Sequence, residues 1–76
     1  MLNWIVSSPG VLGGKPCVRG TRISVEHILE LLASGAERED ILRAYPQVTA
    51  EGVIAALQYA ARSLKNEVIW DLKIPA

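Results

Sequence analysis

With 76 residues, eight cations, eight acids and a formal net charge of zero, the chain is one small domain and not a globally basic nucleic-acid binder. Its single cysteine excludes an intrachain disulfide, and with the single histidine it supplies too few ligands for a structural zinc site. Half of the residues are hydrophobic and the mean hydropathy is +0.23, so we expect a homodimer or a bound partner to cover part of the apolar surface.

The N-terminal segment predicts short strands. Leu2, Trp4 and Val6 recur at every second position, which is typical of a half-buried strand. Residues 7–10, Ser-Ser-Pro-Gly, indicate a turn, and residues 11–12 are a candidate second strand. No apolar run approaches the roughly 20 residues of a membrane-spanning helix, and the N-terminus lacks the basic region of a signal peptide. We therefore expect a cytoplasmic protein with no membrane partner.

A glycine- and cation-rich segment follows at residues 13–25, Gly-Gly-Lys-Pro-Cys-Val-Arg-Gly-Thr-Arg-Ile-Ser-Val. Glycine permits positive φ and proline fixes φ, so this segment predicts a hairpin or arch and not a helix. Val18 and Ile23 are its expected core anchors. Ser24 is the expected N-cap of a helix, because an apolar periodic run begins at the next residue.

Two helices are predicted after this arch. The first spans 25–34, ends at the C′ residue Gly35 and has an apolar stripe of Val25, Ile28, Leu29, Leu31 and Leu32. The second spans 38–44, buries Ile41 and Leu42, and is broken by residues 45–48. Glu37 occupies its N-cap position, where glutamate is a poor cap.

A third helix is predicted over 50–65 with Thr49 as its cap and Gly52 in its first turn, where glycine costs up to about 1 kcal/mol relative to alanine. Its expected inward face is Val53, Ile54, Leu57, Ala60, Ala61 and Leu64. The second and third helices then form a helix-turn-helix pair. Alternation of Val68, Trp70, Leu72 and Ile74 predicts a further strand within residues 67–76.

The motif Gly-Lys-Pro-Cys-Val-Arg-Gly-Thr-Arg-Ile-x-Val at 14–25, followed by Ile41-Leu42 and Tyr45-Pro46, resembles the bacterial DUF433 family over roughly Ile5 to Ala61. The resemblance implies a mostly α fold. The implied fold is a three-helix, homeodomain-like helix-turn-helix core with an N-terminal β-hairpin or arch, to which the alternation within residues 67–76 adds a strand-like C-terminal tail. The chain then forms one domain over 1–76, with the arch in 1–24, the helices in 25–65 and the tail in 66–76. The resemblance also implies an antitoxin of a type II toxin–antitoxin pair, which acts beside a PIN-like nuclease toxin.

Candidate DNA contacts lie on the arch and on the third helix. The arch cations Lys15, Arg19 and Arg22 suit phosphates; the alternative, favoured for Arg22, is pairing with Glu26, Glu30 or the acids of the second helix. By analogy the third helix is the recognition helix, but its first turn carries Glu51, which repels phosphates. Its remaining candidate contacts are Gln58, Arg62 and Lys65.

No catalytic or cofactor site emerges from the sequence. Cys17 is expected to be a small buried residue and not a nucleophile, and His27 a partly buried or surface histidine. The chain shows no paired carboxylates, metal-ligand spacing or nucleotide fingerprint, so we expect no enzyme activity, metal or cofactor. Tryptophan is enriched at binding hot spots, so Trp4 and Trp70 are either core lids or interface anchors. Candidate partner contacts are Trp4, Val68, Trp70, Leu72 and Ile74.

These observations lead to one expected function and two alternatives. The expected function is a homodimeric, non-enzymatic antitoxin-like protein that binds and neutralises a PIN-like nuclease toxin, and that autoregulates by binding DNA. The alternatives are a stand-alone DNA-binding transcriptional regulator and an interaction module without DNA binding. For the expected antitoxin function, the tail at residues 66–76 has two possible partners. It either pairs with an N-terminal strand, its own or that of a second copy, or adds a strand to the toxin.

Overall fold

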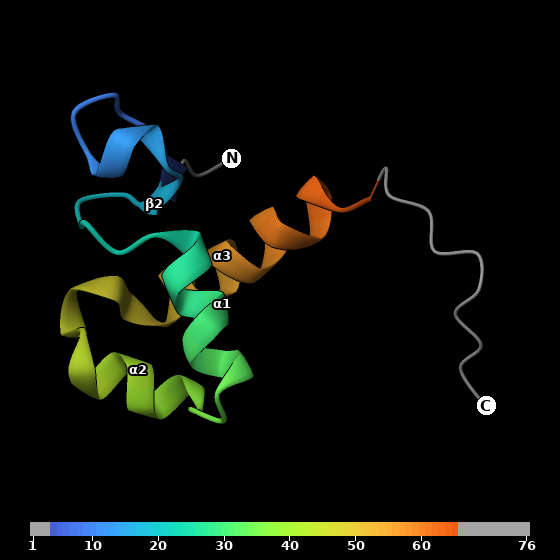
Figure 1. The fold of residues 1–76 in the computed structure, drawn as a ribbon. Helices are drawn as coiled ribbons and strands as arrows, with labels where there is room; N and C mark the ends of the chain where they lie inside the picture. The colour runs from blue at the N-terminus through green and yellow to red at the C-terminus, as the bar shows by residue number, and fades with distance from the viewer. Residues whose placement is uncertain (1–3, 66–76) are drawn as a thin grey trace.

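The computed structural model describes residues 4–65, which form three helices beside a short antiparallel pair of strands (Figure 1). This confirms the predicted mostly α class. In chain order the helices and strands are β1 (Ile5–Val6), β2 (Cys17–Val18), α1 (Val25–Ala33), α2 (Arg38–Ala44) and α3 (Thr49–Ser63). The predicted strand with Val68, Trp70, Leu72 and Ile74 lies outside the described residues, as does Leu2.

The sheet pairs β1 with β2, with Ile5 opposite Val18 and Val6 opposite Cys17. The prediction of a second strand at residues 11–12 was therefore wrong. Leu12 instead opens a 3₁₀ turn, η1 (Leu12–Gly14), whose residues have φ values of 51°, 66° and 91°. Left-handed φ values are incompatible with a strand, so this turn reverses the chain and delivers residues 17–18 to β1.

The arch between β2 and α1 is closed by its own hydrogen bonds. The Thr21 hydroxyl donates to the Val18 carbonyl at 2.8 Å and accepts from the Ile23 N–H at 3.0 Å. The Val18 N–H donates to the Ile23 carbonyl at 3.0 Å, while Gly20 turns the chain at φ 82°. Val18 is buried and Ile23 packs against the core, so both predicted anchors are confirmed.

Both predicted signals at the ends of α1 are confirmed. The Ser24 hydroxyl accepts a hydrogen bond from the His27 N–H at 2.9 Å, which caps the first turn. At the other end Gly35, at φ 106°, donates to the Leu32 carbonyl, and Ala36 donates to the Leu31 carbonyl, each at 3.1 Å. These two bonds form a Schellman motif, for which glycine at C′ is the favoured residue.

Helix α2 has the predicted bounds, and Asp40 contributes to its cap. The Glu37 N–H donates to Asp40 Oδ2 at 2.8 Å, and Ile41 is buried while Leu42 is half-buried. A 3₁₀ turn, η2 (Pro46–Val48), then leads directly into α3. Val48 in this turn is fully buried, so the break between α2 and α3 is itself part of the core.

Helix α3 is capped as predicted but faces the core with a different side. The Thr49 hydroxyl accepts from the Gly52 N–H at 3.2 Å, which confirms the cap. The buried residues are Gly52, Val53 and Ala56, whereas the expected inward residues Ile54, Leu57, Ala61 and Leu64 are exposed.

The reason for this difference is the short distance between α3 and its neighbours. A Cβ atom on Gly52 would lie 3.0 Å from Cγ1 of Val18 and 3.3 Å from Cγ1 of Val48. A helix this close to β2 and η2 leaves no room for a side chain at the point of contact, which is why Gly52 lies there.

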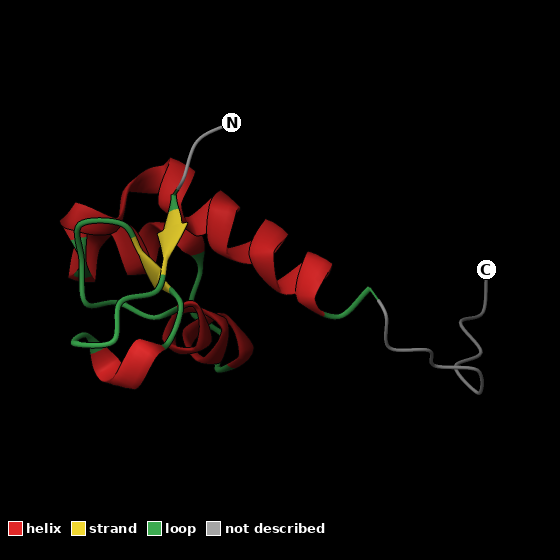
Figure 2. Ribbon diagram, turned by 90° about the horizontal axis from the view of Figure 1, so that it is seen from above, coloured by secondary structure: helices red, strands yellow, loops and turns green. Residues whose placement is uncertain are grey.

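The core lies where α1, α2 and the first half of α3 meet the strands. It consists of Val18, Val25, Ile28, Ile41, Val48, Val53 and Ala56. The second half of α3 projects beyond this core, as both ribbon views show (Figures 1 and 2). Along residues 4–65 no helix combines the length and the apolar character needed to cross a membrane.

Candidate functional site

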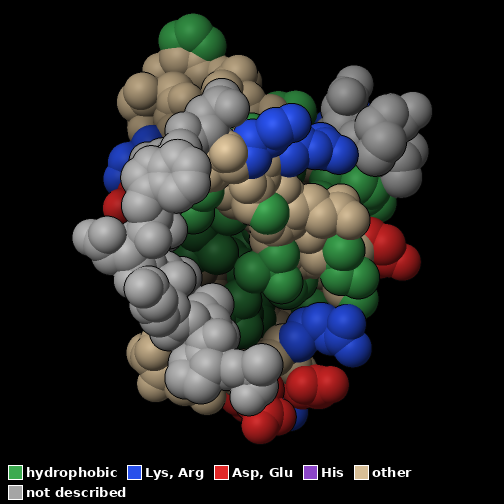
Figure 3. Space-filling view, turned by 90° about the vertical axis from the view of Figure 1, so that its right-hand side faces the viewer, with side chains coloured by type: hydrophobic (Ala, Val, Ile, Leu, Met, Phe, Trp, Pro, Cys, Tyr) green, Lys and Arg blue, Asp and Glu red, His purple; other side chains and the backbone are tan. Residues whose placement is uncertain are grey.

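An apolar groove runs between the N-terminal half of α1 and the projecting half of α3. Its volume is about 270 Å³, and its apolar walls are Pro16, Val25, Leu29, Tyr59, Ala60 and Leu64. Figure 3, seen from the side toward which α3 projects, shows hydrophobic side chains gathered around a hollow on this face. The groove exists because the second half of α3 extends beyond the core. The side of this half that faces α1 is therefore only partly covered.

An ion pair borders this groove. Lys15 Nζ lies 2.9 Å from Glu26 Oε1, and both side chains are exposed. The hydrogen bond and the charge of Glu26 raise the pKa of Lys15, and the same contact with Lys15 lowers the pKa of Glu26. Of the two alternatives for Lys15, ion pairing with Glu26 is therefore the one observed. An exposed pair of this kind stabilises the fold very little.

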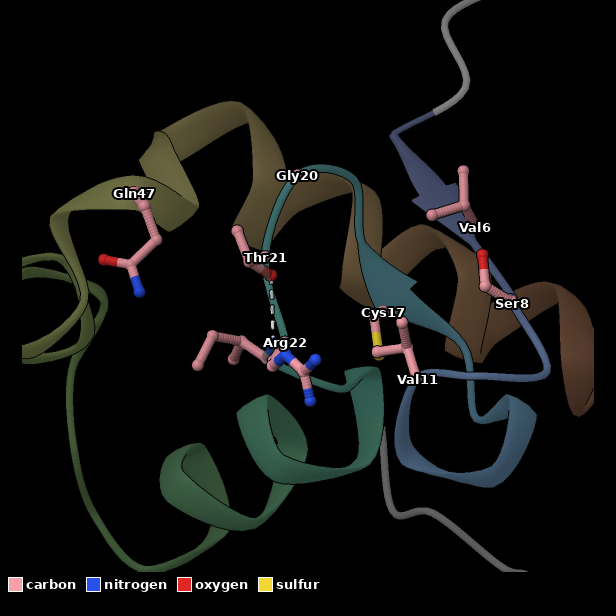
Figure 4. Close-up of a pocket in the computed structure, with 9 residues that line it drawn as sticks. Val6, Ser8, Val11, Cys17, Gly20, Thr21, Arg22 and Gln47 are labelled. Carbon is pink, nitrogen blue, oxygen red and sulfur yellow. Dashed lines mark hydrogen bonds between the residues drawn. The ribbon is translucent and has the colours of Figure 1, made fainter.

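Arg22 lies at a more polar cavity on the other side of the arch. This cavity has a volume of about 570 Å³, and the Arg22 guanidinium lies between Gln47 and Val11 (Figure 4). Within residues 4–65 Arg22 makes no ion pair with Glu26, Glu30 or the acids of α2, contrary to the pairing alternative. Glu26 and Glu30 do line a neighbouring cavity together with Arg22, so these acids lie near it without forming an ion pair with it.

Arg19 contacts an aromatic ring instead of an acid. The guanidinium carbon of Arg19 lies 6.0 Å from the centre of the Trp4 ring, and the backbone N–H of Arg19 donates to the Trp4 carbonyl at 2.7 Å. This geometry is that of a cation–π contact at the limit of its range. Trp4, a predicted interface anchor, is half-buried and is thus held to the arch through Arg19.

The candidate contacts on α3 are all exposed. Gln58 and Arg62 lie in the projecting half, Lys65 lies two residues past its end, and Glu51 lies at the opposite end of the helix. Lys15 lines the groove together with Leu64, and it lines a further cavity of about 420 Å³ together with Arg22. The fold thus places Lys15 between Arg22 and the end of α3.

His27 and Cys17 have structural surroundings. His27 is half-buried, and its Nε2 lies 3.2 Å from the Tyr45 hydroxyl, with the two rings edge to face at 5.8 Å. The Cys17 thiol is buried and donates to the Lys15 carbonyl at 3.3 Å. Both residues are placed as expected. Nowhere in residues 4–65 do three His, Cys, Asp or Glu side chains gather as a metal site.

Sequence reasoning missed Tyr59 as a groove residue and misplaced the large side chains of α3. The available signal was the spacing of Gly52, Ala56 and Ala60, which recur every four residues on one side of the helix. Small residues at that spacing mark the side on which a helix approaches its neighbours most closely. The larger residues Ile54, Leu57 and Leu64 must then point elsewhere.

Comparison with known proteins places these features in a family. The family described as "Protein of unknown function (DUF433)" matches residues 5–60. The chain is 43% identical over 56 residues to the uncharacterized protein y4eO of Sinorhizobium fredii, which covers 74% of this chain and 25% of that protein. It therefore spans about a quarter of the length of this relative. The crystal structure of a DUF433 member from Anabaena variabilis matches with a TM-score of 0.76 and 38% identity, covering 79% of this chain and 59% of that one.

Proposed function

The chain belongs to the DUF433 family, and we propose that it is a non-enzymatic, antitoxin-like protein that binds and neutralises a PIN-like nuclease toxin. The observation that carries this proposal is the open apolar groove between α1 and α3. The groove can bury the apolar side chains of a partner, which supports its use as a protein-binding site.

The size and lining of the groove favour a protein partner over a small molecule. Its volume of about 270 Å³ is below the roughly 300–1,000 Å³ of most small-molecule sites. It suits one or two large side chains presented by a helix of the toxin. Tyr59 offers an apolar ring with a hydroxyl at its edge, the combination enriched at binding hot spots. The Lys15–Glu26 pair at the rim supplies polar contacts that orient the bound segment.

Autoregulation by DNA binding is the second part of the proposal, and the state of the arch arginines favours it. Arg19 and Arg22 are exposed and have no acidic partner within residues 4–65, so both can contact phosphates. Glu51 in the first turn of α3 opposes insertion of that end into a groove of DNA. The arch, assisted by Arg62 and Lys65, is therefore the proposed contact. A stand-alone regulator and an interaction module without DNA binding are the alternatives.

Co-expression tests toxin binding. The native chain should relieve the growth inhibition caused by a PIN-like nuclease encoded beside it, and the two proteins should copurify. Tyr59→Glu should abolish both effects, because the substitution removes the aromatic ring and places in the groove a carboxylate that would lose its hydration when the toxin binds. Leu12→Glu is the matched control, since Leu12 is 45% exposed, Tyr59 is 39% exposed, and Leu12 does not line the groove.

The outcomes separate the candidate functions. If Tyr59→Glu neutralises as well as the native chain, the groove is not the toxin site. If no nuclease binds but a promoter duplex does, the protein is a regulator. DNA binding should weaken steeply with salt, and Arg19→Glu or Arg22→Glu should lower the affinity and reduce the salt slope. If the affinity measured by gel shift does not respond to these changes, DNA binding is not part of the function.

A further inference from the structure

The outer side of α3 carries a second apolar surface that the groove does not explain. Ile54, Leu57, Ala61 and Leu64 follow one another at intervals of three, four and three residues, and all four are exposed. Ile54 and Leu57 are 44% exposed and Leu64 is 56% exposed, values high for large aliphatic side chains. We call these four residues the outer row. Alternating steps of three and four are the spacing of a helix that packs lengthwise against another helix.

We propose that the outer row is the seam of a homodimer in which α3 packs antiparallel against α3 of a second copy. A two-fold interface must be self-complementary, so that each contact occurs twice. The outer row meets this condition: Ile54 falls opposite Leu64 of the second copy, and Leu57 falls opposite Ala61 of the second copy. The small Ala61 opposite Leu57 lets the two helices approach closely in the middle of the row. At each end, Ile54 and Leu64 bury their larger side chains against each other.

The polar residues beside the row fit the same register. In antiparallel helix pairs the residues on one flank face their equivalents across the axis, and here that flank is Glu51, Gln58 and Lys65. Glu51 then meets Lys65 of the second copy, and Gln58 meets Gln58. All three side chains are exposed in the single chain and free to form these contacts. The dimer would thus carry two charge-complementary ends and a central amide pair.

A parallel pairing of the same row has no such complementarity. It would set Gln58 against Val53 and Lys65 against Ala60, and it would place the two Lys65 ends side by side. The other flank of the row, Val53 and Ala60, belongs to the core of each copy. The groove and the outer row share only Leu64, so the antiparallel arrangement covers the end of the groove at Leu64 and leaves its other walls, among them Tyr59 and Ala60, open.

The expected affinity follows from the length of the helix. Fifteen residues at 1.5 Å each give a seam about 22 Å long, which buries less than the roughly 1,600 Å² of a standard interface. We therefore expect a reversible dimer with a dissociation constant in the micromolar range. This inference does not depend on the toxin proposal, and the purified chain alone tests it.

Sedimentation equilibrium of the full chain is the first test. The weight-average mass should rise with concentration from the 8.3 kDa of one chain toward twice that value. Leu57→Lys should weaken dimerisation at least 10-fold without changing the helical circular dichroism signal, because Leu57 is exposed in the single chain. Leu12→Lys is the matched control, since Leu12 has nearly the same exposure and lies outside α3; it should dimerise like the native chain.

Charge reversal tests the antiparallel register. Glu51→Lys should weaken the dimer by setting two lysines against each other, and Lys65→Glu should do so by setting two glutamates against each other. The double variant should dimerise like the native chain, because a lysine at position 51 then faces a glutamate at position 65 of the second copy. A native chain that stays monomeric at 1 mM, unchanged dimerisation of Leu57→Lys, or a double variant no better than the single variants would each overturn the proposal.

Discussion

Replacing Gly52 by alanine tests the close approach between α3 and the strand–turn side of the core. The added methyl group would lie 3.0 Å from Cγ1 of Val18, 3.3 Å from Cγ1 of Val48 and 3.6 Å from Oγ1 of Thr49. Val18 and Val48 are both fully buried and β-branched, so neither can rotate away cheaply. The helix or the strand must therefore move to admit one carbon atom.

Two opposing effects set the magnitude. Overpacking of a tight core costs about 1–3 kcal/mol, whereas alanine in place of glycine in a helix gains up to about 1 kcal/mol. Overpacking should win, because the gain is smallest in a first turn and the contact with Val18 is shorter than ordinary van der Waals distance. We expect Gly52→Ala to lower the free energy of unfolding by about 1–2 kcal/mol, or Tm by roughly 4–15 °C for a domain of this size.

Urea and thermal melts followed by circular dichroism, at one fixed protein concentration, would measure this change. Gly10→Ala is the matched control, because Gly10 has open space around it and should gain about 0.4–1 kcal/mol through the unfolded chain. In a Val18→Ala background, which removes the nearest methyl group, Gly52→Ala should cost less than it does in the native chain. If Gly52→Ala is as stable as Gly10→Ala, the helix does not pack as closely as described.

Three further predictions concern the core, the rim and the tail. Ile28→Ala should cost about 2–5 kcal/mol in melts, whereas Leu57→Ala should cost less than about 1 kcal/mol in dilute solution because Leu57 is exposed. Lys15 lowers the pKa of Glu26, so the small stabilisation of the fold by this pair is present above the usual glutamate pKa. It is lost as the pH falls through the lowered pKa of Glu26. Glu26→Gln should therefore make the stability, measured in melts at successive pH values, depend less on pH in the acid range. Deleting residues 67–76 should leave the helical signal intact but weaken neutralisation of the toxin or dimerisation, because the expected tail strand adds contacts to those of the groove or the outer row. Unchanged binding and oligomeric state would show that the tail has neither role.

Local chemistry made part of the fold predictable. Ser24 at one end of α1 and Gly35 at the other act through hydrogen bonds to residues at most four positions away, so their roles could be read from the sequence. The bounds of α2 followed from Pro46 in the same way. These signals need no knowledge of what the helices pack against.

The orientation of α3 and the partner of β1 depend on distant residues. Gly52 faces Val18 and Val48, and neither contact has a signature within the helix itself beyond the small residues at four-residue spacing. Residues 11–12 are apolar and follow the turn signal at residues 7–10, which favours them as the second strand. The left-handed turn at Leu12 carries the pairing on to Cys17 instead. The contact partners of the arginines could not be predicted from the sequence either, because the fold brings Arg19 to Trp4, which is distant from it along the chain.

The projecting half of α3 also determines how backbone amides of this helix exchange with solvent. Val53 and Ala56 anchor the first half in the core, whereas residues 61–65 are all exposed. Amides in the second half can therefore open by local fraying, at a lower free energy than unfolding of the whole domain. Their deuterium uptake should slow whenever the groove or the outer row is covered, while the amides of the first half report global unfolding. One helix thus contains both a reporter of binding and an internal reference for stability.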